Sequence, residues 1–242
     1  MKRSGWERLL ELWQNVFFTD LFVIACLFAG LIVGIKSWQK DKIYFLIFLY
    51  IISALLLILL CDVINPVFLN LKGRESSVFT ETFNTCFGII EYTVFYIFFY
   101  NTLRSKKTKK VMTLFLIPYT LTISVFLIKE FDNSLSKTEI VYFSDLIISG
   151  ELLFLNGLCI VYYYELLKMN PVANLLKSPS FWIVTGLFFY CLLIASFFII
   201  SENFIKEYKQ IYSGFYALHY ISFGLLFLAI TKAFLCKKTL TS

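Results

Sequence analysis

Long apolar segments separated by short polar ones cover most of the chain. The apolar positions run continuously and do not alternate with a period of two, so the pattern predicts helices and not the strands of a β-barrel. Seven segments approach the length of about 20 residues that a helix needs to cross a bilayer. They are 17–35, 43–60, 77–103, 111–128, 140–167, 181–201 and 213–236. The pattern therefore predicts an all-α bundle of seven transmembrane helices.

A short amphipathic helix is predicted before the first of these segments, over 4–17. Its apolar stripe contains Trp6 and Trp13, and tryptophans on such a stripe are typical of a helix that lies at the membrane interface. No segment between the apolar runs is long enough for a separate soluble domain. We therefore expect residues 1–242 to form a single polytopic membrane domain.

Composition agrees with a membrane protein. Hydrophobic residues make up 59% of the chain and charged residues 16%, whereas a soluble domain has about 25% charged residues. The six cysteines lie in or beside apolar segments and none forms a CxxC pair, so neither a disulfide framework nor a zinc site is predicted. The net charge of +6 comes without a basic patch on a soluble surface, and we expect no nucleic acid partner. No metal and no cofactor is expected.

Basic residues gather on one side of the predicted bundle, most densely in the loop after the third segment. This cluster comprises Arg104, Lys106, Lys107, Lys109 and Lys110. Because cytoplasmic loops carry an excess of lysine and arginine, the bias predicts a plasma (inner) membrane protein with its N-terminus outside and its C-terminus in the cytoplasm. The basic loop is then the predicted contact for a cytoplasmic partner. Glu165 and Lys232, at the same side, are expected to extend towards the interface.

Ionisable side chains inside the apolar segments are the candidates for chemistry. The third segment carries Glu81 and Glu91 on one side of the helix, together with Asn84. A charged group in hydrocarbon costs at least about 2.5–3.5 kcal/mol. We therefore expect this side to face other helices or a wet cavity and not lipid.

Similar side chains fall in the fifth and seventh segments, namely Asp145 and Glu151, then Tyr216, His219 and Tyr220. With the predicted orientation, most of them lie in the outer half of the membrane, where converging faces would form an acidic pocket open to the outside. Such a pocket would bind a small cation or respond to protons, with the single histidine as a partner or a pH switch. Alternatively, these groups only form hydrogen bonds between helices, with the acids neutral.

Seven helices with an outside N-terminus resemble the layout of G-protein-coupled receptors and microbial rhodopsins. Leu103-Arg104-Ser105 stands where such a receptor carries D-R-Y, and Lys232 lies too near the cytoplasmic end to form a retinal Schiff base. A single histidine excludes the zinc motif of the seven-helix hydrolases related to ceramidases and adiponectin receptors. The resemblance therefore implies only the number of membrane spans and their orientation. It implies no activity and no site residues.

Several classes of function fit these patterns. The first is a sensory or receptor-like membrane module that binds its ligand or proton in the acidic pocket and signals through a partner protein. The second is a small-solute or proton-coupled transporter or channel that uses Glu91 and Glu151; Pro118, inside the fourth segment, favours it, and the lack of an internal repeat disfavours it. An intramembrane enzyme is not expected, because no nucleophile–base pair or metal-ligand spacing is visible. A structural or assembly subunit is the remaining class.

Overall fold

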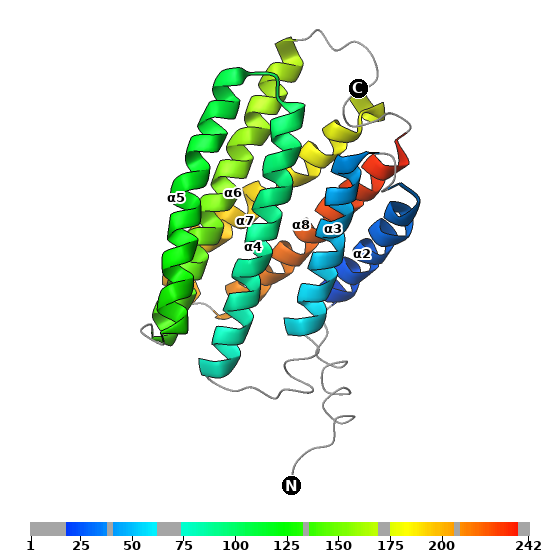
Figure 1. The fold of residues 1–242 in the computed structure, drawn as a ribbon. Coiled ribbons are helices and arrows are strands. Elements are labelled where there is room, and N and C mark those ends of the chain that lie inside the picture. Colours follow the sequence, from blue (N-terminus) through cyan, green and yellow to red (C-terminus); the bar gives the residue numbers. More distant parts are fainter. Residues whose placement is uncertain are drawn as a thin grey trace.

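The computed structural model describes residues 18–37, 41–61, 74–132, 136–168, 175–205 and 209–236. This part of the chain forms seven α-helices and a short 3-10 turn, and it contains no strand (Figure 1). The elements are α2 (Phe18–Ser37), α3 (Lys42–Ile58), α4 (Arg74–Thr102), α5 (Lys106–Phe131), α6 (Lys137–Lys168), η3 (Leu175–Lys177), α7 (Pro179–Ile205) and α8 (Lys209–Leu235). The all-α class predicted from the sequence is confirmed. The amphipathic helix predicted over 4–17 lies outside the described residues.

Within the described residues, five helical stretches are long and apolar enough to cross a membrane. They are Lys42–Cys61, Thr82–Thr102, Lys106–Lys129, Tyr142–Lys168 and Leu218–Leu235. The apolar stretches found in α2 and α7, Leu21–Ser37 and Pro179–Ala195, are shorter. These helices are compatible with a membrane protein, whereas a bundle in which seven helices cross stays a prediction.

The basic segment predicted as a loop is largely helical. α5 begins at Lys106 and not near residue 111. Ser105 caps its first turn, because the backbone N–H of Thr108 donates to Ser105 Oγ at 3.2 Å. Hydropathy marks only the apolar part of a helix, so it missed this polar first turn. The predicted partner contact therefore lies mostly on α5, after a turn of three residues at 103–105.

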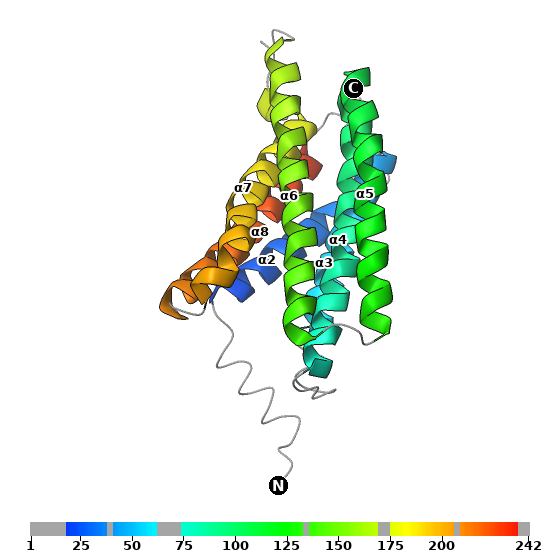
Figure 2. The same ribbon diagram turned by 90° about the vertical axis from the view of Figure 1, so that its left-hand side faces the viewer.

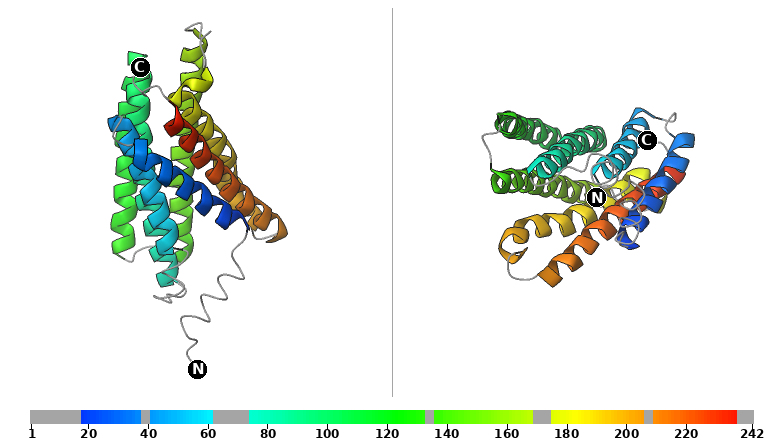
Figure 3. Two further views of the ribbon diagram at one scale, coloured as in Figure 1. Left: turned by 90° about the vertical axis from the view of Figure 1, so that its right-hand side faces the viewer. Right: turned by 90° about the horizontal axis from the view of Figure 1, so that it is seen from below.

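The helices pack in an order that leaves α5 at the edge of the bundle. α7 packs against α6 and α8, α2 packs against α8, and α4 contacts α3 and α6. Figures 2 and 3 show α3 to α6 standing nearly parallel, while α2, α7 and α8 are tilted across them. α5 packs against α4 and α6. Its outward face exposes more than half of each of five apolar side chains, Leu114, Ile117, Leu121, Val125 and Ile128.

Aromatic side chains fill the core around Tyr50 of α3. Its ring stacks on Phe87 of α4 and Phe227 of α8, with centroids 5.5 and 5.6 Å away. The Phe95 ring packs against the Tyr50 ring in an edge arrangement, with 5.2 Å between the centroids. The packing of these rings fixes the orientation of Tyr50, so its hydroxyl has a defined position in the middle of the bundle.

Candidate functional site

Glu91 of α4 is a buried carboxyl group held by a tyrosine of another helix. Its side chain is only 4% exposed. Tyr50 of α3 donates a hydrogen bond from its hydroxyl to Glu91 Oε1 at 3.1 Å. The aromatic core places that hydroxyl, so the position of Glu91 is set by packing between α3 and α4.

Glu151 of α6 is the second buried carboxyl group, with an exposure of 2%. The hydroxyl of Tyr119, on α5, donates to Glu151 Oε2 at 2.5 Å. The Tyr119 ring stacks on Tyr92 of α4 with 4.3 Å between centroids. Glu151 Oε1 has no hydrogen-bond partner among the described residues. One oxygen of this carboxyl group is therefore available to another molecule.

The two carboxyl groups lie on α4 and α6, two helices that pack against each other. Tyr50 and Tyr119 bring in α3 and α5, so side chains from four helices meet here. We call Glu91 and Glu151, with Tyr50 and Tyr119, the carboxyl pair.

A glycine makes the close approach of α4 and α6 possible. Gly88 lies one turn before Glu91 on α4. A Cβ atom added there would lie 3.2 Å from Glu151 Oε2 and 3.9 Å from the Tyr119 hydroxyl. The absence of a side chain at Gly88 thus lets the Glu151 carboxyl group and the Tyr119 hydroxyl pack directly against α4.

The described surroundings of the carboxyl pair contain tyrosine hydroxyls but no lysine or arginine partner. Removing an ion from water costs several kcal/mol when no opposite charge compensates it. Two ionised carboxylates in this position would in addition repel each other. Chemically, such a pair can share a proton and can exchange it when a cation or water reaches the site.

The structure distributes the other predicted site residues over several places. Asn84 is half-buried on α4, about two turns before Glu91. His219 of α8 lies against the rings of Phe223 and Tyr220, with centroids 6.2 and 5.4 Å away. Its Nδ1 atom has no hydrogen-bond partner within the described part of the chain.

An aromatic ring lies next to both His219 and the surroundings of the carboxyl pair. Phe223 contacts the rings of Phe87 and Tyr190, at 6.3 and 5.4 Å. The structure thus brings Glu91 and Glu151 together and places His219 beyond Phe223. The side chains of Glu81, Asp145 and Tyr216 lie outside the described part of the structure.

The predicted partner contact is held by a carboxylate that the sequence did not single out for this role. Glu165 of α6 accepts the backbone N–H of Arg104 at 2.8 Å and that of Ser105 at 3.0 Å. Glu165 was expected to extend towards the interface, and the structure adds that its carboxylate ties the turn between α4 and α5 to α6. Both of its oxygens accept from backbone amides of this turn.

The same end of the bundle carries most of the described lysines. The ends of α4, α6 and α8 and the start of α5 lie together there (Figure 1). Lys106, Lys107 and Lys110 are exposed. Three further lysines there lie near aromatic rings, with Nζ to centroid distances of 5.0 Å for Lys109 on Tyr100, 4.4 Å for Lys168 on Tyr164 and 5.9 Å for Lys232 on Trp182. Such pairs are typical of a membrane–water interface.

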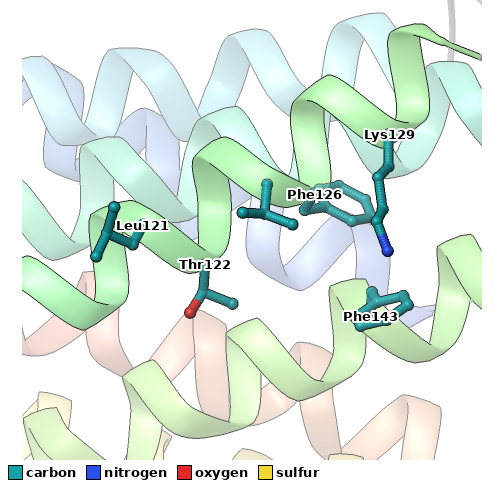
Figure 4. Close-up of a pocket in the computed structure, with 6 residues that line it drawn as sticks. Leu121, Thr122, Phe126, Lys129 and Phe143 are labelled. Carbon is teal, nitrogen blue, oxygen red and sulfur yellow. The ribbon is translucent and has the colours of Figure 1, made fainter.

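A hollow of about 260 Å³ lies between α5 and α6 towards their opposite end (Figure 4). It is lined by Leu121, Thr122, Val125, Phe126, Lys129 and Phe143. The lining is mostly apolar and includes no carboxyl group, so this hollow is separate from the carboxyl pair. Among the described residues, no group of three or more His, Cys, Asp or Glu side chains is arranged to hold a metal ion.

No protein-family description, curated protein sequence or solved structure matches this chain. A function is therefore proposed from the geometry of the carboxyl pair and of the basic end alone.

Proposed function

We propose that this chain is an integral membrane protein of seven crossing helices that acts as a sensory, receptor-like module. Protons or a small cation at the carboxyl pair change how α5 packs on α6. The change reaches the basic end of the bundle, where a partner protein binds. The proposal assigns the chain no catalytic reaction.

One observation carries this proposal: α6 holds α5 at one point and the turn before α5 at another. In the middle of the bundle, Glu151 accepts the Tyr119 hydroxyl. At the basic end, Glu165 accepts the amides of Arg104 and Ser105. With a rise of 1.5 Å per residue, the two glutamates are about 21 Å apart along α6. A change of charge at Glu151 therefore acts on the same helix pair that presents the basic surface.

α5 is suited to move because little protein covers it. Its outward face is apolar and exposed. When the carboxyl pair loses a proton, a buried negative charge appears, which is several kcal/mol less stable until water or a cation compensates it. A shift of α5 away from α6 would admit that water or cation, and it would also move the turn at 103–105.

The concentration of lysine and arginine at one end supports the proposed orientation. The end with Lys106, Lys107 and Lys110 would lie in the cytoplasm of the plasma membrane, with the C-terminus, and the N-terminus would lie outside. The exposed, unneutralised charge suits an acidic surface of a cytoplasmic or membrane signalling protein.

Hydrogen exchange measured by mass spectrometry tests the proposal directly. The protein in lipid nanodiscs is compared at pH 5.5 and pH 8, with exchange corrected for the intrinsic effect of pH. We expect the amides of Arg104 and Ser105 to change their protection between the two conditions in the wild type but not in Glu151→Gln. Ser149→Ala is the control on the same helix, since its hydroxyl only bonds Leu146 O. An equal pH response in wild type and Glu151→Gln would contradict the proposal.

Proton-coupled transport is a second candidate, favoured by the position of Pro118 next to Tyr119. Proline removes a backbone donor and loosens the helix at the point where α5 binds Glu151. A transporter would move a solute into liposomes under a pH gradient, and Glu91→Gln and Glu151→Gln would both stop this flux in folded protein. Purification from native membranes with a stoichiometric signalling protein, and no flux, would favour the sensory module.

A further inference from the structure

Four buried polar atoms lie on α4 and α6, two helices that pack against each other. Thr85 Oγ1 and the Tyr92 hydroxyl on α4 have no hydrogen-bond partner in the described part of the chain, and neither do Ser144 Oγ and Glu151 Oε1 on α6. These four side chains are 3%, 1%, 0% and 2% exposed, respectively. Each therefore presents a polar group to the interior of the bundle without a protein group to bind it.

Other hydroxyls in these helices are satisfied locally. Ser149 donates to Leu146 O at 3.0 Å, Thr102 to Phe98 O at 2.8 Å and Thr231 to Phe227 O at 2.7 Å. Such bonds to the carbonyl one turn earlier are the usual solution for serine and threonine in an apolar helix. Thr85 and Ser144 depart from this pattern although they are more deeply buried, and buried polar groups of this kind normally bind ordered water.

The register of the two helices places both hydroxyls on the same side of the carboxyl pair. α4 and α6 pack together and run in the same direction (Figure 1). Thr85 precedes Glu91 by about 9 Å along α4, and Ser144 precedes Glu151 by about 10 Å along α6. The hydroxyls therefore lie between the carboxyl pair and the end of the bundle where α4 and α6 begin.

Gly88 lies about one turn after Thr85, and its missing side chain lets the Glu151 carboxyl group pack against α4. Thr85 and the Glu151 carboxyl group are therefore separated by about one helical turn along this interface, a distance that a few water molecules would span.

We propose that Thr85 and Ser144 hold a chain of water molecules that conducts protons between the starting ends of α4 and α6 and Glu151. In the last step an O–H bond of a hydronium ion breaks and a new O–H bond forms on Glu151 Oε1. The proton is replaced from bulk water, and no electron is transferred. This inference rests on the proposed function, since it supplies the route by which the sensory site is loaded.

Several other groups that can titrate face Glu151. They are Glu91 and Tyr92 from α4, Tyr119 from α5, and Tyr190 and Cys191 from α7. Tyr50 of α3 binds Glu91 and not Glu151. Glu91 is the only carboxyl group among them. A probe of the route must therefore distinguish Glu151 from Glu91.

Infrared spectroscopy of the reconstituted protein provides such a probe. A protonated carboxyl group has a C=O stretch that shifts when its proton is replaced by deuterium, and Glu151→Gln identifies the part that belongs to Glu151. After a rapid change from H₂O to D₂O, we expect this shift to be about tenfold slower in Thr85→Val and in Ser144→Ala, which corresponds to about 1.4 kcal/mol in the barrier. Ser149→Ala, a buried serine of α6 with a satisfied hydroxyl, should exchange at the wild-type rate.

Thr85→Ser keeps the hydroxyl and should exchange like the wild type, which separates the loss of the hydroxyl from a general change in packing. The proposal would be overturned if both Thr85→Val and Ser144→Ala exchanged at the wild-type rate. It would also be overturned if Ser149→Ala slowed the exchange equally, or if no carboxyl band changed in Glu151→Gln. If Thr85→Val and Ser144→Ala exchange normally while the amides at 103–105 still respond to pH through Glu151, the water route is wrong and the sensory function stands. If the two variants exchange tenfold more slowly but the amides at 103–105 do not respond to pH, the sensory function is wrong and the water route stands.

Discussion

The Tyr119 hydroxyl of α5 donates a hydrogen bond of 2.5 Å to Glu151 Oε2 of α6. This bond links the helix at the edge of the bundle to the buried carboxyl pair. The Tyr119 ring also stacks on Tyr92 of α4. The ring anchors α5 by packing, and the hydroxyl couples α5 to the charge state of the site. The two contributions can be separated by substitutions that remove only one of them.

Tyr119→Phe removes the hydroxyl and keeps the ring. It leaves Glu151 Oε2 without its donor, and a buried acceptor without a partner costs about 1–3 kcal/mol. We therefore expect a clear loss of stability, measured as the free energy of unfolding in a mixed-micelle titration. Tyr96→Phe is the matched control, because the Tyr96 hydroxyl joins Thr113 of α5 in an exposed position at 3.1 Å. Equal effects of the two substitutions would show that the buried bond has no special contribution.

Gly88→Ala tests the close approach of α4 to Glu151. The added methyl group would lie 3.2 Å from Glu151 Oε2, where the carboxyl group must move away. Overpacking of this kind costs about 1–3 kcal/mol, so we expect a lower thermal midpoint and a changed carboxyl band in the infrared spectrum. Gly157→Ala on α6 is the control, because nothing lies within 4 Å of its added Cβ. There alanine should stabilise the helix by about 0.5–1 kcal/mol.

Glu165→Ala removes the acceptor that holds the turn between α4 and α5. The amides of Arg104 and Ser105 lose their partners, and we expect these two amides to exchange faster with solvent. The fold of the core should be unchanged, because Glu165 lies at the end of α6. Lys168→Ala, one turn further on α6, should leave the exchange of these amides as in the wild type. Unchanged protection in Glu165→Ala would mean that Glu165 does not hold this turn.

The two buried carboxyl groups are recognisable in the sequence, whereas the tyrosines that bind them are not. Glu91 and Glu151 stand out because a charged residue in an apolar segment is rare. Tyr50 and Tyr119 are two of 15 tyrosines, and their partners lie 41 and 32 positions away. Hydropathy carries no information about such pairs, which arise only when helices pack.

The polar ends of the helices were predicted less well for a related reason. α5 begins in a run of lysines whose hydropathy resembles that of a loop, and a single cap at Ser105 decides where the helix starts. In the sequence, Glu165 cannot be distinguished from any other charged residue at the end of an apolar segment. Its role depends on the amides of a turn about 60 positions earlier.

Glu139 gives the start of α6 a defined dependence on pH. Its carboxylate accepts the backbone N–H of Ser136 at 2.8 Å, and Ser136 Oγ accepts the Glu139 N–H at 3.3 Å, which together form a capping box. The bonds from Ser136 lower the pKa of Glu139 below its usual 4.5, with a smaller contribution from Lys129. A lowered pKa in the folded state means that the ionised carboxylate stabilises the cap. This stabilisation is complete above pH 4.5 and is lost as the pH falls through the lower pKa of the folded state.

We therefore expect the first turn of α6 to exchange its amides faster as the pH falls below 4.5, after correction for the intrinsic rate. In Glu139→Gln the side chain cannot ionise, so the exchange should be fast already at pH 7 and should lose this pH dependence. Ser136→Ala should have a similar effect at pH 7, because it removes the other half of the capping box. Native protection of this turn in Glu139→Gln at pH 7 would show that the charge does not stabilise the start of α6.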